Sequence, residues 1–267
     1  MTSLFSLSKR IVEHSGVSSV NLLDDLDLQD GVGTLPRAGT ASRAQTRRKS
    51  SDDRNLMMQR RGDTILEHFR RVYLSMQAVS EQENFPSIGV TSAITGEGRT
   101  TVATGVAAAM AADMESPVVL VEADLSHPGV HRILGIAPQP GICEYLRGES
   151  DLSTALRQIS DRFFVLPAGD ARGEAARMTR QLTTGDLRSR LSASGALLVF
   201  DLPPILTSSY GVLASTLADS LTFVVRGGYT MDFQVKDALS RLDDTVVKGV
   251  VLNGAQTQLP RWLRDRG

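Results

Sequence analysis

Residues 91–101 read Thr91-Ser92-Ala93-Ile94-Thr95-Gly96-Glu97-Gly98-Arg99-Thr100-Thr101. A short apolar run precedes this stretch, and an alanine-rich run follows it directly. The order predicts a β-strand, a glycine-containing loop and an α-helix. Gly96 and Gly98 permit backbone angles that aim successive N–H groups inward, and the N-terminal end of the helix adds positive potential. The stretch therefore predicts a site for phosphate groups.

The loop matches the phosphate-binding signature G-x-x-x-x-G-K-[ST] with two departures. Ala93 takes the first glycine position and Arg99 takes the lysine position, whereas Gly98 and Thr100 match. We expect Thr100 to bind Mg²⁺ and Arg99 to face the β- and γ-phosphates of ATP. Because arginine is larger than lysine and planar, the loop favours nucleotide binding over fast phosphoryl transfer. An ordinary turn between a strand and a helix is the alternative.

The expected nucleotide-binding residues of this P-loop are Thr95, Gly96, Glu97, Gly98, Arg99, Thr100 and Thr101.

Acidic residues end two later apolar runs. Glu122 and Asp124 follow the run that ends at Val121, and Asp201 follows the run that ends at Phe200. Ligands of α/β sheets bind at the carboxyl ends of the strands, so these side chains should face the P-loop. Carboxylates and a threonine hydroxyl are suitable magnesium ligands. We therefore expect Mg²⁺ at Thr100, Asp124 and Asp201.

Apolar runs alternate with helical stretches from residue 62 onward, and this alternation predicts the fold class. We expect an α/β P-loop NTPase fold with a mostly parallel sheet and helices on both faces. The expected strands are Ser87–Thr91, Pro117–Val121, Phe163–Leu166, Ala196–Phe200, Leu221–Val225 and Val246–Leu252. The expected helices lie near residues 62–82, 99–113, 141–158, 173–193, 208–217 and 230–242.

Charge and hydropathy divide the chain into three parts. Residues 37–61 hold eight basic and two acidic residues and little that is apolar, so they cannot offset the entropy of folding. We expect residues 1–61 to form a largely disordered tail, with a short helix near the start that could dock on a partner. Residues 62–257 should form the nucleotide-binding domain, and residues 258–267 a C-terminal tail.

Composition narrows the cellular setting. The 267 residues carry a net charge of -1, which argues against nucleic acid as a partner. The single cysteine, Cys143, excludes an intrachain disulfide and is compatible with a reducing compartment. We see no signal peptide and no apolar run of membrane-spanning length. We therefore expect a cytoplasmic protein that a partner recruits to the inner face of the cell membrane.

The order of these motifs resembles the bacterial P-loop tyrosine autokinases of capsule and exopolysaccharide export. The resemblance covers residues 62–255 and follows phrases of that family in sequence. After the P-loop, the matching phrases are Val119-Leu120-Val121-Glu122-Ala123-Asp124-Leu125, Gly141-Ile142-Cys143-Glu144-Tyr145-Leu146, Leu166-Pro167-Ala168-Gly169, Val199-Phe200-Asp201-Leu202-Pro203-Pro204, and Val251-Leu252-Asn253-Gly254.

The resemblance implies roles for particular residues. Glu122 would be the base that activates the attacking tyrosine hydroxyl, and Arg99 would act with it in catalysis. Asp124 and Asp201 would hold magnesium, and Asn253 would lie near the nucleotide base. The implied partner is the cytoplasmic end of a membrane polysaccharide chain-length regulator. Part of a ring-assembly motif survives at Glu67 and Arg70, which implies a homo-oligomer.

Several departures from the family pattern bear on catalysis. Arg99 replaces a lysine, Glu122 replaces an aspartate and Ser126 replaces an arginine. The tyrosine-rich C-terminal tail of the family is missing here. Two hypotheses stay open: a tyrosine kinase that acts on a partner, and a catalytically weak nucleotide-binding regulator of the same pathway. A partitioning-type ATPase is disfavoured, because Ile94 stands where that class has a second lysine.

Overall fold

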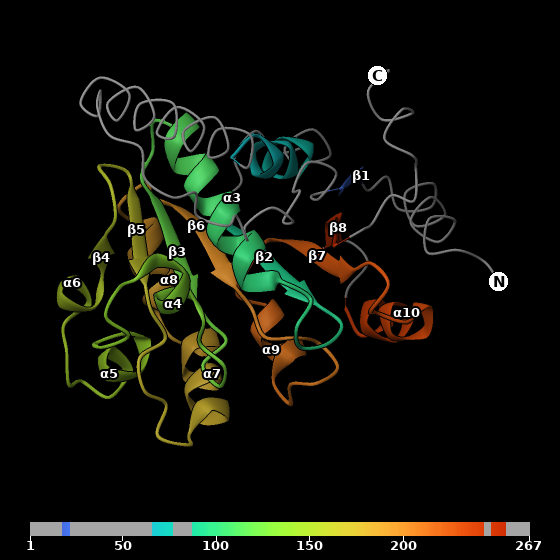
Figure 1. Cartoon of the computed structure of the whole chain (residues 1–267). Helices are drawn as coiled ribbons and strands as arrows, with labels where there is room; N and C mark the ends of the chain where they lie inside the picture. Colours follow the sequence, from blue (N-terminus) through green and yellow to red (C-terminus); the bar gives the residue numbers. More distant parts are fainter. Residues whose placement is uncertain (1–17, 22–65, 77–86, 243–246, 255–267) are drawn as a thin grey trace, which may run out of the picture.

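The computed structural model describes residues 18–21, 66–76, 87–242 and 247–254. A mostly parallel sheet of eight strands, in the order β1-β8-β7-β2-β6-β3-β5-β4, forms its centre (Figure 1). Only β4 runs antiparallel, against β5. The strands are β1 (Ser18–Asn21), β2 (Ser87–Ser92), β3 (Val118–Glu122), β4 (Arg157–Gln158), β5 (Phe163–Leu166), β6 (Leu197–Asp201), β7 (Ser220–Arg226) and β8 (Val247–Asn253).

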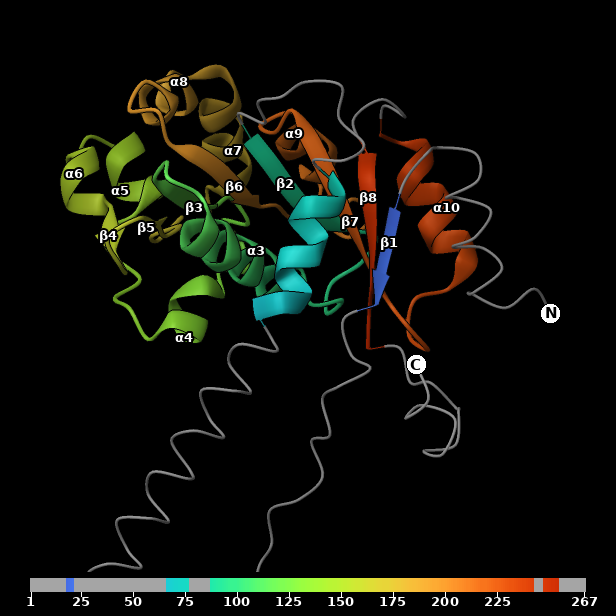
Figure 2. The ribbon, with the colours of Figure 1, turned by 90° about the horizontal axis from the view of Figure 1, so that it is seen from above.

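Helices cover both faces of the sheet, as the alternating pattern predicts (Figure 2). The helix at residues 66–76, α3 and α4 share one apolar core with one face of the sheet. The other helices pack in a second core on the opposite face. The helices are α3 (Arg99–Asp113), α4 (Val130–Leu134), α5 (Ile142–Leu146), α6 (Leu152–Ala155), α7 (Ala175–Thr184), α8 (Leu187–Ser192), α9 (Gly211–Ser215) and α10 (Asp232–Ser240).

The two cores follow from the alternation of side chains along each strand. In β3, Val118 and Leu120 belong to the core under α3, whereas Val119 and Val121 belong to the other core. The central strands β2 and β3 are buried along their whole length, which explains why their sequences hold only apolar or small residues up to the acidic end of β3. The last residues of these strands therefore decide which side chains lie at the carboxyl edge of the sheet.

The expected elements and the structure agree closely for the strands and for α3. Two expected helices are divided. The stretch 141–158 holds α5, α6 and β4, and the stretch 173–193 holds α7 and α8, with Gly185 between them. Gly148 has a positive φ of 73°, a conformation that ends a helix readily. The short α4 follows Pro128 and Gly129 and was not expected.

Part of the expected N-terminal tail is a strand. Ser18–Asn21 pairs in parallel with Gly249–Leu252 of β8, where we expected no regular structure. Four residues of ordinary polarity carry no periodic signal, so only the pairing with β8 identifies them as a strand. The rest of the tail, its expected docking helix and the expected C-terminal tail lie outside the described residues.

No helix among the described residues has both the length and the apolar character needed to cross a membrane.

A glycine lets two helices of the first core approach closely. Gly105 lies in the middle of α3, and a Cβ built on it would stand 2.3 Å from the ring of Phe69. Phe69 is buried in the helix at residues 66–76. The ring of Phe69 occupies the space that a side chain at position 105 would need. The helix at residues 66–76 therefore packs directly against the backbone of α3.

We predict that Gly105→Ala destabilises the fold by about 1–3 kcal/mol through overpacking. In an unobstructed helix the same change would stabilise by about 1 kcal/mol, so the sign of the effect is decisive. Urea denaturation measures it. The double variant Phe69→Ala, Gly105→Ala is the control, because alanine at 105 should cost nothing once the ring is removed. Additive effects of the two changes would contradict the contact.

Candidate functional site

The loop between β2 and α3 lies at the carboxyl edge of the sheet, beside the ends of β3 and β6 (Figure 1). Gly96 and Gly98 have φ values of 88° and 92°, which L side chains rarely adopt. Gly98 is the residue before α3, and its carbonyl accepts a hydrogen bond from the N–H of Val102 at 3.0 Å. The loop thus has the geometry expected of a phosphate cradle at a helix N-terminus.

Glu97 braces this loop from within and is fully buried. One carboxylate oxygen accepts the N–H of Ile94 at 2.6 Å, and the other accepts the hydroxyl of Thr230 at 2.5 Å. The side-chain amide of Asn253 donates to the Glu97 carbonyl at 2.9 Å. The loop after β7 and the last residue of β8 therefore fix the shape of the P-loop, and both Glu97 and Asn253 take part in that brace.

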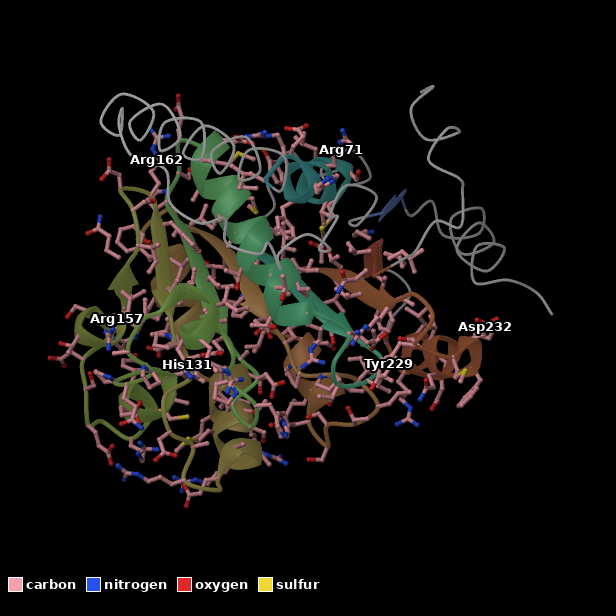
Figure 3. All side chains as sticks on the ribbon, in the orientation of Figure 1. Arg71, His131, Arg157, Arg162, Tyr229 and Asp232 are labelled. Carbon is pink, nitrogen blue, oxygen red and sulfur yellow. The ribbon has the colours of Figure 1, made fainter. Side chains whose placement is uncertain are left out.

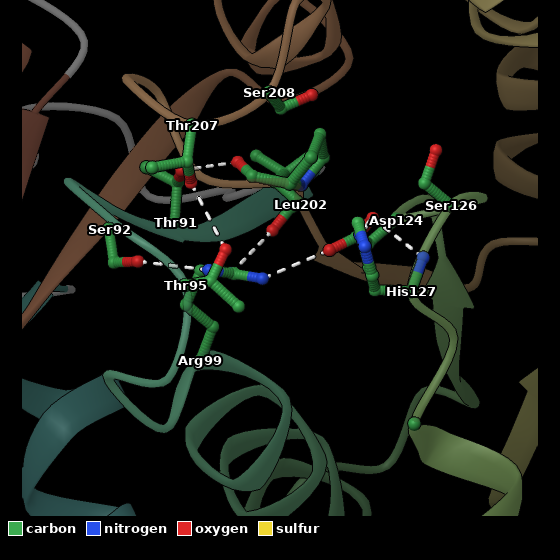
Figure 4. Close-up of polar contacts among 12 residues, drawn as sticks. Thr91, Ser92, Thr95, Arg99, Asp124, Ser126, His127, Leu202, Thr207 and Ser208 are labelled. Carbon is green, nitrogen blue, oxygen red and sulfur yellow. Dashed lines mark hydrogen bonds and ion pairs between the residues drawn. The ribbon is translucent and has the colours of Figure 1, made fainter. Parts of the chain in front are cut away.

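Arg99 lies across the ends of three strands (Figure 4). Its Nε donates to the Leu202 carbonyl at 2.9 Å, and its Nη2 pairs with Asp124 at 2.9 Å. Its Nη1 donates to the Ser92 hydroxyl at 3.1 Å and to the Ile94 carbonyl at 3.2 Å. Only 6% of the residue is exposed. We expected Arg99 to face phosphates, and instead most of its N–H groups bind the protein.

Glu122 is fully buried and accepts three backbone N–H groups. Its Oε1 accepts from Gly129 at 2.5 Å and from Val130 at 2.7 Å, and its Oε2 accepts from Ala168 at 2.9 Å. The N-terminus of α4 and the loop after β5 are thereby tied to β3. The extra methylene of glutamate relative to aspartate extends the carboxylate toward these loops.

Asp124 and Asp201 differ sharply in their surroundings. Asp124 pairs with Arg99 through Oδ2 and accepts the N–H of His127 through Oδ1 at 3.2 Å. Asp201 is almost fully buried, and neither of its carboxylate oxygens has a hydrogen-bond partner among the described residues. The Cα atoms of Glu122 and Asp201 are paired in register, so both side chains point to the face under α3.

Burial is the main reason why Asp201 is a weaker acid than an ordinary aspartic acid. It raises the pKa of this carboxyl to about 7, and Glu122 and Asp124 add to the rise. Arg99 and the Thr100 hydroxyl act in the opposite direction. Among the described residues only the Thr100 hydroxyl lies close enough to act on this carboxyl as a donor, and such a buried carboxylate is the arrangement that a cation would complete.

The remaining expected residues lie at the rim. Thr95 and Gly96 are exposed, and Thr101 is exposed on the first turn of α3. The Thr95 hydroxyl lies 3.1 Å from that of Thr207, which joins the P-loop to the segment after β6. The structure thus brings Arg99, Thr100, Glu122, Asp124 and Asp201 to one edge of the sheet.

Several contacts at the loop were missed by the sequence reasoning. Ser92, Thr207 and Thr230 donate or accept hydrogen bonds at the loop, and single hydroxyl residues carry no periodic signal. Tyr229 follows β7, is 51% exposed and lies near α10 (Figure 3). Arg226 stands over its ring at 5.1 Å and donates to the Gly96 carbonyl at 3.1 Å.

We predict that Asp201→Asn stabilises the protein without magnesium or nucleotide at about pH 8, by a few kcal/mol at about 1.4 kcal/mol per pKa unit. The folded pKa of Asp201 is raised, so its stabilising contribution is complete below the unfolded pKa of about 3.8 and is lost as pH rises through about 7. The gain should therefore shrink at about pH 5. Thermal melting in EDTA measures both values.

Asp113→Asn is the control of opposite sign. The Arg70 side chain holds the pKa of Asp113 below its usual value. Loss of that carboxylate should lower the melting temperature at about pH 8. An Asp201→Asn variant that melts below the wild type at the higher pH would contradict the buried, unpartnered carboxylate.

Comparison with known proteins agrees with this geometry, although no family model matches the chain. The tyrosine-protein kinase YwqD of Bacillus subtilis is 26% identical over 192 residues, which are 70% of this chain and 80% of YwqD. The succinoglycan biosynthesis transport protein ExoP of Rhizobium meliloti is 28% identical over 71% of this chain, but the matched region is only 25% of ExoP.

Solved structures share the fold. The kinase domain of the Escherichia coli tyrosine kinase Etk superposes with a TM-score of 0.68 at 21% identity, over 94% of this chain and 96% of that domain. The septum site-determining protein MinD of Pyrococcus horikoshii, solved in complex with Mg-ADP, gives 0.54 at 19% identity over 66% of this chain and 74% of MinD. These likenesses confirm the α/β P-loop fold. The chain is a divergent homologue of the bacterial tyrosine-protein kinases.

Proposed function

We propose that this protein binds ATP with Mg²⁺ at the P-loop and regulates polysaccharide polymerisation or export as a kinase-type domain with weak phosphoryl transfer. The observation that carries the proposal is the braced loop at the N-terminus of α3, with the unpartnered carboxylate of Asp201 opposite it. Inward N–H groups and a helix N-terminus attract phosphates, and a buried carboxylate attracts the accompanying cation.

Magnesium fits the residues at this edge of the sheet. Asp201 offers two free carboxylate oxygens, and Thr100 offers a hydroxyl beside them. No three His, Cys, Asp or Glu side chains of the described chain gather into a metal cluster, so phosphate oxygens and water would complete the coordination. Bound there, magnesium would neutralise charge on the β- and γ-phosphates. Asp124, the third expected ligand, is already paired with Arg99.

The pathway rests on the relatives. ExoP is by name a succinoglycan biosynthesis transport protein, and YwqD is by name a tyrosine-protein kinase. We propose that this chain acts in the cytoplasm and docks on the cytoplasmic end of a membrane chain-length regulator. The near-neutral net charge supports a protein partner over nucleic acid.

Self-assembly through Glu67 and Arg70 has weaker support. Arg70 donates to both carboxylate oxygens of Asp113 at 2.5 and 2.7 Å and to Glu67 at 2.5 Å. The guanidinium is thus engaged within the chain. A homo-oligomer built on Arg70 would have to share or replace these contacts, and sedimentation of Arg70→Ala against the wild type would test it.

Calorimetric titration tests the nucleotide site. We predict that ATP with Mg²⁺ binds the wild type and that Gly98→Ala weakens binding at least about tenfold, or about 1.4 kcal/mol. A Cβ at Gly98 would stand 2.2 Å from the Asn253 amide nitrogen and would distort the cradle.

Gly135→Ala is the matched control. Gly135 also has a positive φ, of 64°, but nothing lies within 4 Å of its added Cβ. The Gly135→Ala variant should have the same kind of backbone strain as Gly98→Ala and should keep the wild-type affinity for ATP. Absence of ATP binding to the wild type at millimolar concentration would overturn the proposal.

Phosphorylation of a partner tyrosine is the second candidate function, favoured by the kinase relatives. The tyrosine oxygen would attack the γ-phosphorus, ADP would leave, and Glu122 would take the hydroxyl proton. Glu122 would first have to release N–H donors from its carboxylate, so we expect transfer to be slow.

Radiolabelled ATP, incubated with the protein and a candidate regulator, measures this transfer. We predict weak labelling that Asp201→Asn abolishes, because the variant removes the carboxylate proposed to hold the cation. Labelling that persists in Asp201→Asn would assign the activity to a contaminating kinase. Rapid labelling by the wild type would contradict the proposed weak transfer and favour a competent kinase.

A further inference from the structure

We infer that the Arg99 guanidinium is the resident cation of Asp124, so that Asp124 is not a magnesium ligand and Asp201 with Thr100 would hold the ion without it. This inference rests on the proposed ATP site and deepens it. Arg99, which replaces the lysine of the signature, pairs with Asp124. Asp201 is then the carboxylate that remains for magnesium, although the sequence alone places both aspartates alike at strand ends.

The contacts of Arg99 leave it little freedom. A guanidinium has five N–H groups, and four of them donate to Leu202, Ser92, Ile94 and Asp124. These acceptors come from the end of β2, the residue after β6, the P-loop and the segment after β3; Figure 4 shows the bonds to Ser92, Leu202 and Asp124. One N–H remains for a phosphate oxygen. As long as these four bonds hold, Arg99 can offer at most one N–H to a nucleotide.

Asp124 is satisfied, whereas Asp201 is not. Its side chain is 3% exposed, and both oxygens already accept donors, one from Arg99 and one from the His127 N–H. The imidazole of His127 lies 3.8 Å from the same Oδ1. A magnesium ion at Asp124 would have to displace the guanidinium, which would leave a buried cation without its carboxylate.

The positive charge at position 99 does not by itself decide whether Asp124 can bind magnesium. Glu122, Asp124 and Asp201 carry three negative charges when ionised, and Arg99 carries one positive charge. A lysine at position 99 would carry the same charge, but it has three N–H groups at one point instead of a fork. It could not reach Leu202, Ser92, Ile94 and Asp124 together. Arg99→Lys therefore changes the geometry of the cation and keeps the charge.

Thermal melting with magnesium alone tests the pair without nucleotide. Millimolar Mg²⁺ should raise the melting temperature of Arg99→Lys more than that of the wild type, by several degrees, because lysine releases Asp124 to join Asp201. The double variant Arg99→Lys, Asp124→Asn should lose this extra rise. Equal shifts in the wild type and in Arg99→Lys would overturn the inference, even if ATP bound normally.

Calorimetry gives the second readout, as the ratio of the ATP Kd in EDTA to the Kd in Mg²⁺. We expect this ratio to be larger for Arg99→Lys than for the wild type, because a released Asp124 would add a second carboxylate to the magnesium site. Failure of ATP to bind in either buffer would sink the proposed function, and the melting data would still decide on Arg99.

Asp124→Asn in the wild-type background is the variant to use if Arg99→Lys does not fold, since asparagine keeps an acceptor for Arg99. It should tighten ATP binding in both buffers by a similar factor, because a negative charge near the phosphates is removed. If it weakened binding only in Mg²⁺, Asp124 would be a magnesium ligand and the inference would fail.

Discussion

The ion pair between Arg99 and Asp124 joins the first turn of α3 to the segment after β3, and both partners are buried. It depends on the parallel order of β2, β6 and β3, which brings three carboxyl ends to one edge. The hydrogen bonds of Arg99 to Ser92 and Leu202 use the ends of the other two strands. The sheet thus brings the strand ends of the site together, and Arg99 links all three of them.

Buried carboxylates hold the loops at this edge of the sheet. Glu97 fixes the P-loop, Glu122 fixes the loops before α4 and after β5, and Glu144 accepts the N–H groups of Gly141 and Asp170. Loops have few backbone partners of their own, so a carboxylate with two acceptor oxygens can satisfy several N–H groups at once. The irregular segments around the candidate site are ordered in this way.

The strands and α3 were predictable because short, mostly apolar runs lie between turn residues, and an alanine-rich run follows the glycine loop directly. The positions of the site residues were predictable, because the carboxyl ends of parallel strands lie at one edge of the sheet. The directions of its side chains were not: the same sequence is compatible with Arg99 facing a phosphate or facing Asp124. The position of Glu122 at a strand end said nothing of the three N–H groups it accepts, because two come from the irregular turn at the start of α4 and the third from a loop 46 residues further along the chain.

The pairing of β1 with β8 has a consequence for shortened forms of the chain. Ser18–Asn21 is the outermost strand, and it supplies the hydrogen-bond partners on one side of β8. A protein that starts at residue 62 would contain every residue of the candidate site, yet the backbone of Gly249–Leu252 would be left open along that side. Unpaired edges recruit strands from other molecules. Such a fragment could bind its ligand correctly and still assemble through contacts that a chain with Ser18–Asn21 does not make.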